Sequence, residues 1–163
     1  MDIYNLINLF GKEYRDKELV EFFKQDGFDV VTSIQNWMKT SVYKGMESSV
    51  YAENINNGYS LHFEDELDYL DIEDGKYGES GNYYFTCIHI YSQNADGYSE
   101  YKGELINGVK ITNTINEIRE LMKEQYKRHE FLDEDIWDNG DGYSVNINYR
   151  EQTTPYMISI TKK

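Results

Sequence analysis

The chain has 163 residues, of which 39% are apolar and 15% aromatic, and its net charge is −14. This length suits one domain with a core of its own, so we predict a single domain over 1–163, and the aromatic content is too high for a disordered chain. No apolar run approaches the roughly 18 residues of a membrane span. The start of the chain carries an acid where a signal peptide carries bases, so we expect a cytoplasmic protein.

Two helices are predicted near the N-terminus. Residues 2–10 have apolar side chains at helical spacing, with Asp2 to cap the start and Gly11 to end the helix. A second helix is predicted from Asp16, a good N-cap, to Gly27, a residue that suits the position after a helix. Residues 28–40 are ambiguous, and their β-branched side chains favour a strand at the start.

Strand patterns dominate the middle of the chain. Residues 48–54 and 59–63 flank Asn56-Asn57-Gly58 and predict a hairpin. Residues 82–92 are largely apolar or aromatic on both alternating faces, which is typical of an interior strand, and Cys87 is expected to be a small buried side chain there. A turn at 94–97 and a short strand near 98–105 are expected to follow.

A third helix is predicted from Thr114 to about Arg128, because Thr114 and Glu117 form a capping box. Residues 143–149 and 156–160 alternate apolar and polar side chains and predict a hairpin with one solvated face. These elements predict an α+β fold: an antiparallel sheet of about five to seven strands with three helices, two of them N-terminal.

Nearly all of the net charge lies in two segments. Residues 64–79 contain eight acids and one lysine, and residues 130–141 contain six acids and no base. Focused charge of this kind favours a basic protein partner, although two solvated loops without a partner would have the same composition. No cluster of lysine or arginine is present to neutralise phosphates, so we expect no direct binding to nucleic acid.

The sequence shows no pattern of an enzyme or of a cofactor site. A calcium loop needs oxygen ligands at fixed positions, but a frame that starts at Asp135 has Trp137 at position 3 and Asn146 at position 12. The three histidines are isolated, and phosphate-binding and nucleophile motifs are missing. We therefore predict no catalytic residue, no metal and no cofactor.

The order of motifs resembles small immunity proteins of bacterial polymorphic-toxin systems, including the contact-dependent inhibition type. The stretches "YSLHFEDE" and "YKGELINGVKITNTINEIRELM" precede a loop with a tryptophan and two strands. The matching positions are Tyr101, Gly103, Leu105, Gly108, the start of a helix at Thr114, and Trp137. The resemblance implies a protein that binds the catalytic domain of a cognate toxin in the cytoplasm and blocks it without catalysis.

We expect the contact with this toxin in the acidic loop 130–141, with Trp137 as its anchor, although Trp137 alternatively covers the edge of the core. The expected contact residues there are Asp133, Glu134, Asp135, Trp137, Asp138 and Asp141. The competing patch consists of Asp65, Glu66, Asp68, Asp71, Glu73 and Asp74. The toxin is expected to be basic, possibly a nuclease, with no membrane partner. Two alternatives stay open: an acidic adaptor or nucleic-acid mimic that inhibits another enzyme, and a small enzyme or ligand-binding domain that uses the aromatic sheet.

Overall fold

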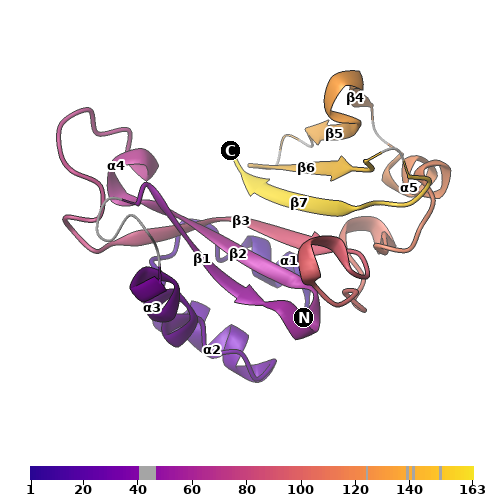
Figure 1. The fold of residues 1–163 in the computed structure, drawn as a ribbon. Helices are drawn as coiled ribbons and strands as arrows, with labels where there is room; N and C mark the ends of the chain where they lie inside the picture. The colour runs from indigo at the N-terminus through magenta and orange to yellow at the C-terminus, as the bar shows by residue number, and fades with distance from the viewer. Residues whose placement is uncertain (41–46, 124, 139, 141, 151) are drawn as a thin grey trace. The chain divides into compact units, whose positions relative to one another are not determined.

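The computed structural model describes residues 1–40, 47–123, 125–138, 140, 142–150 and 152–163. Its strands form an antiparallel sheet of seven in the order β1-β2-β3-β7-β6-β5-β4 (Figure 1). The predicted α+β class and the predicted sheet size are thereby confirmed. No helix in these ranges has both the length and the apolar content needed to cross a bilayer.

The helices and strands have the following bounds. The helices are α1 (Ile3–Ile7), α2 (Lys17–Gln25), α3 (Val30–Thr40), α4 (Glu66–Tyr69) and α5 (Ile115–Met122). The strands are β1 (Ser49–Asn54), β2 (Tyr59–Asp65), β3 (Tyr83–Tyr91), β4 (Tyr126–His129), β5 (Glu134–Asp138), β6 (Tyr143–Asn148) and β7 (Met157–Lys162). Four 3₁₀ turns complete the fold: η1 (Ile55–Asn57), η2 (Ala95–Gly97), η3 (Ile106–Gly108) and η4 (Glu130–Leu132).

The chain divides into two compact units. Unit 1 contains Met1–Ile7, Asn54–Ser60 and Ile88–Lys163, and unit 2 contains Asn8–Glu53 and Leu61–Cys87. Each unit is built from separate stretches of chain, so neither is a contiguous domain. The prediction of a single domain over 1–163 stays a prediction.

In unit 2, α2 and α3 lie together on one side of β1 and β2 (Figure 1). Asp16 caps α2 as predicted, since its side chain accepts hydrogen bonds from the backbone of Glu18 and Leu19. The buried Phe23 of α2 meets Phe85 of β3 edge to face, with ring centroids 6.4 Å apart. The core of this unit therefore lies between its helices and its strands, and Cys87 is buried as predicted.

The strand expected at the start of 28–40 is wrong, because this segment is the helix α3. The side chain of Asp29 accepts hydrogen bonds from the backbone N–H and the hydroxyl of Thr32, which caps the first turn. Val30 and Ile34 recur at helical spacing and are both buried. Capping and helical periodicity therefore outweigh the strand preference of the β-branched residues.

His62 of β2 predicts a pH effect on the stability of the protein. Its ring lies 4.8 Å from the ring of Tyr51, and burial lowers the pKa of its imidazole. The unfolded chain therefore binds more protons at this group than the folded chain once the pH falls below about 6.5. The stabilising contribution is complete above that pH and is lost as the pH falls through the folded pKa.

We expect the wild type to lose more stability than a His62→Gln variant between pH 7.5 and pH 5. Urea denaturation at several pH values measures the free energy of unfolding of both proteins. The difference between the two curves removes the contribution of all titrating groups that the two proteins share. If the two proteins lose the same stability as the pH falls, His62 has the same protonation in the folded and the unfolded chain, and this prediction is wrong.

In unit 1, α5 and the η3 segment cover one face of β6 and β7. Thr114 and Glu117 form the predicted capping box, with both reciprocal hydrogen bonds present. The residues that meet between these elements are all apolar: Leu105, Ile106, Val109, Met122, Val145, Ile147, Ile158 and Ile160. The predicted C-terminal hairpin is confirmed, since β6 and β7 pair antiparallel with Val145 opposite Ile160.

Two sequence predictions in unit 1 need correction. The third helix ends at Met122, because Lys123 takes a left-handed conformation and closes the helix with a bond to the carbonyl of Arg119; the chain then forms β4. Residues 98–105 form no strand. They make isolated backbone bonds instead, from Ser99 to Ile55 and from Tyr101 to Tyr91, and Tyr98 stacks on Tyr91.

Candidate functional site: the acidic segment 64–79

A single buried carboxylate holds both ends of the acidic segment in unit 2. Asp65 ends β2, and its side chain accepts hydrogen bonds from the backbone N–H of Leu67 at 3.0 Å and of Gly78 at 2.9 Å. The first bond caps the short helix α4, and the second closes the loop that follows it. Asp65 therefore has a structural role and presents no surface to a partner.

The segment between these two bonds is braced from within. The backbone N–H of Ile72 donates to the carbonyl of Leu67 at 2.8 Å. Gly75 packs against the methyl groups of Leu67, and its φ of 153° is a backbone conformation that residues with a side chain rarely adopt. At the base of the loop Tyr69 stacks on Tyr84 with ring centroids 4.5 Å apart. These contacts predict one preferred loop conformation.

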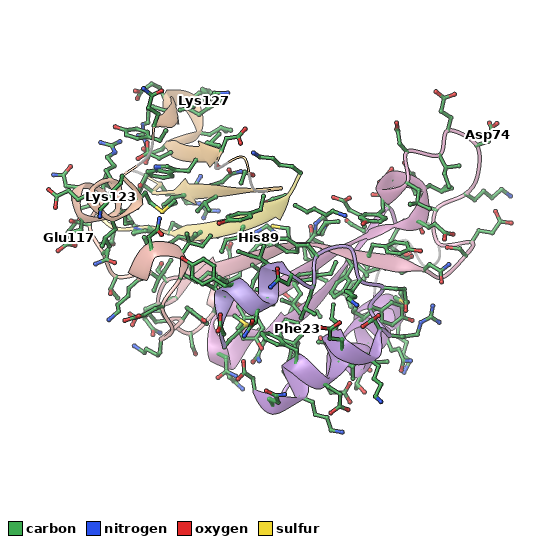
Figure 2. All side chains as sticks on the ribbon, turned by 180° about the vertical axis from the view of Figure 1, so that it is seen from behind. Phe23, Asp74, His89, Glu117, Lys123 and Lys127 are labelled. Carbon is green, nitrogen blue, oxygen red and sulfur yellow. The ribbon has the colours of Figure 1, made fainter. Side chains whose placement is uncertain are left out.

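The outer surface of the segment combines carboxylates with exposed apolar side chains. The exposed acids are Asp68, Asp71, Glu73, Asp74 and Glu79, and the exposed apolar residues are Leu70, Ile72 and Tyr77. In Figure 2 the label of Asp74 marks the tip of this loop, which projects beyond the ends of β2 and β3. A hollow of about 310 Å³ is lined by Leu67, Ile72, Glu66, Asp74 and Glu79, among others.

The carboxylates of this segment are not neutralised within the part of the chain that the structure describes. None of these carboxylates forms an ion pair with a described residue, and the side-chain hydrogen bonds that they accept come from neutral donors. Asp68 accepts the hydroxyl of Tyr77 at 2.8 Å, and Glu66 accepts from Asn82 and from the hydroxyl of Tyr84. The hydrogen bond to Asp68 and the charge of this carboxylate raise the pKa of Tyr77.

The second acidic block, 130–141, is used differently. It was expected to be an exposed loop, but residues 134–138 form β5, which pairs with β4 on one side and β6 on the other. Asp135 is completely buried, and its carboxylate accepts hydrogen bonds from the guanidinium of Arg119 at 2.9 and 3.1 Å, from Arg128 at 3.3 Å and from the hydroxyl of Tyr149 at 3.2 Å.

The same pattern extends to the neighbouring acids of this block. Asp133 pairs with Arg128, and Asp138 pairs with Lys163. Burial, together with the charge of Asp135 and the hydrogen bond to it, raises the pKa of Tyr149, so this phenol stays a donor inside the cluster. The basic partners of this block therefore come from its own unit, and it supplies less unbalanced negative charge than its sequence suggests.

Trp137 is also completely buried. It lies opposite Val145 in β6 and Tyr126 in β4, and the ring of Tyr126 is 5.2 Å away. This burial fits its alternative role as cover for the core, and its role as an anchor of the toxin contact stays a prediction. Glu134 is half-buried and accepts a bond from Asn148, and Asp141 lies outside the described residues.

The sequence pointed to the acids of 64–79 and to Tyr77 among them, but Leu70 and Ile72 were missed. These two residues follow no helical or strand spacing, and they stand among acids in a glycine-containing stretch. Apolar residues in such a context have no element to bury them, which is the signal that was available.

No family model, no curated protein and no solved structure matches the chain. Within the described ranges no three histidine, cysteine, aspartate or glutamate side chains are grouped so as to hold a metal ion. The chemistry of the surface is therefore the basis on which a function is proposed.

Proposed function

We propose that the protein is a non-catalytic inhibitor, an immunity protein that binds the basic catalytic domain of a cognate bacterial toxin in the cytoplasm and occludes it. The observation that supports this proposal most directly is the acidic segment 64–79. Its exposed carboxylates have no basic partner in the described chain, whereas those of 130–141 largely do.

The chemistry of this segment suits a tight protein contact. Clustered carboxylates attract a basic surface over several ångströms and speed encounter. Exposed apolar side chains such as Leu70 and Ile72 lose water on binding and slow dissociation. A loop that is closed by Asp65 and braced by Leu67 loses little conformational freedom when it binds.

The proposed partner is an enzyme that acts on nucleic acid. Such an enzyme binds phosphates in a basic cleft, and a projecting row of carboxylates is a substitute for the phosphate backbone. Occupation of the cleft blocks the enzyme without any chemical step, so the proposal needs no catalytic group in the inhibitor. Asp71, Glu73 and Asp74, at the outer part of the loop, are the residues we assign to this contact.

The direct test first searches the neighbouring genes for one that encodes a toxin-like domain, and then co-expresses that domain with this protein for co-purification and a nuclease assay. The proposal predicts a stoichiometric complex in which toxin activity is lost and is restored when the complex is dissociated. A toxin domain that stays fully active in the presence of excess inhibitor would contradict it. Tight binding to a different basic enzyme would instead favour the acidic-adaptor hypothesis.

A further inference from the structure

The η4 turn of unit 1 carries a second apolar feature that the acidic segment does not account for. Phe131 lies at the tip of this turn with 92% of its surface exposed, while the next most exposed large apolar side chains reach 52%. Leu132 beside it is 47% exposed. An aromatic side chain in water contributes almost nothing to stability, and here two exposed apolar residues, Phe131 and Leu132, are adjacent in one turn.

The turn that carries Phe131 is fixed on several sides. The backbone N–H of Leu132 donates to Nδ1 of His129 at 3.3 Å, and its carbonyl accepts from the side-chain amide of Asn148 at 3.0 Å. Asp133 has a left-handed backbone with φ of 52°, and its carbonyl accepts from the backbone N–H of Tyr149 at 3.1 Å. These hydrogen bonds fix the backbone of the turn, although the side chain of Phe131 at its tip is exposed.

Carboxylates surround this tip. Glu130 lies directly before Phe131, and Asp133 and Glu134 follow Leu132. The largely exposed side chain of Glu130 forms an ion pair with Arg128 at 3.7 Å, and the same guanidinium engages Asp133 and Asp135, so the acids at the tip outnumber the arginine that they share. A rigid apolar tip with an acidic rim complements an apolar pocket with a basic rim, and the same acids oppose contact with an anionic lipid surface.

We propose that Phe131 and Leu132 insert into an apolar pocket of the protein partner whose mouth carries lysine or arginine side chains. This inference rests on the proposed function, since it concerns the same toxin partner. Because the turn is held before binding, Phe131 is the anchor of that contact: it buries a large surface at little entropic cost.

The test compares Phe131→Ala with Ile55→Ala, in which an exposed apolar residue away from the η4 turn is truncated. Binding to the purified toxin domain is measured by calorimetry, and melting temperature is measured for each variant. We expect Phe131→Ala to weaken binding about 30-fold or more while its melting temperature stays within about 1 °C of the wild type. Ile55→Ala should change neither quantity.

The outcomes separate this inference from the proposed function. If Phe131→Ala binds the toxin domain as tightly as the wild type, the inference is wrong and the proposed function is unaffected. A wild type that fails to bind the toxin domain overturns the proposed function, and the inference falls with it. Binding to vesicles of anionic lipid that depends on Phe131, without any effect on the toxin complex, would also overturn the inference.

Discussion

Replacement of Asp135 with alanine is expected to lower the free energy of unfolding by about 3–5 kcal/mol. The carboxylate is fully buried and is the shared acceptor for Arg119, Arg128 and Tyr149. Its removal leaves Arg119 without its carboxylate partner and Arg128 with only Asp133 and Glu130, and it leaves the buried hydroxyl of Tyr149 without its acceptor. Asp135→Asn keeps the size of the side chain but removes the charge, so it should also be strongly destabilising.

Urea denaturation measures this change, and Asp74→Ala is the matched control. Asp74 is exposed and has no ion pair in the described chain, so its loss should change stability by no more than about 0.5 kcal/mol. An Asp135→Ala protein that is as stable as the control would mean that the arginine cluster is solvated and does not hold β5 in place.

Replacement of Trp137 with alanine is expected to cost about 3–5 kcal/mol of stability as well, through a different mechanism. The side chain is completely buried between β4, β6 and the core, so its truncation leaves a large cavity. Its indole Nε1 has no hydrogen-bond partner within the described chain. Trp137→Phe therefore removes no polar contact and should cost clearly less than Trp137→Ala.

Thermal melting and urea denaturation of the two Trp137 variants check this prediction. Binding assays on the folded fraction then separate stability from affinity. If Trp137→Ala melted like the wild type but bound the partner weakly, the side chain would belong to a contact surface, as the sequence first indicated, and its burial in the free protein would not persist in the complex.

Local signals made much of the fold predictable. Asp16 and Thr114 cap their helices through neighbours two or three residues away, so both caps are visible in a short window of sequence. Alternating side chains likewise identified β6 and β7. The end of the third helix was not visible, because Lys123 closes it in a left-handed conformation that lysine seldom takes.

The roles of the two acidic blocks were hidden because their partners are distant in the chain. In the sequence Asp135 looks like one more acid in a charged run. Arg119 and Tyr149, which lie 16 and 14 residues away, donate hydrogen bonds to its buried carboxylate. No ion pair joins a base to the carboxylates of 64–79 in the described chain, although Lys76 lines the same hollow as Asp74 and Glu79. The density of acids in the sequence therefore identified two candidate contact segments. Only the ion pairs formed in the folded chain distinguished one from the other.

We propose that the acidic segment 64–79, and not 130–141, steers the basic partner. Stopped-flow association with the toxin domain tests it most directly. The variant carries Asp71→Asn, Glu73→Gln and Asp74→Asn, and asparagine tolerates the left-handed backbone at position 71. The control neutralises three exposed acids elsewhere, Glu21, Glu104 and Glu120, as glutamine.

At about 50 mM salt we expect the loop variant to associate roughly tenfold more slowly than the wild type, and the control to associate nearly as fast. The difference should shrink as salt rises to about 500 mM, because the screening length falls below about 5 Å. Equal association rates and equal salt dependence for the wild type, the loop variant and the control would contradict the claim.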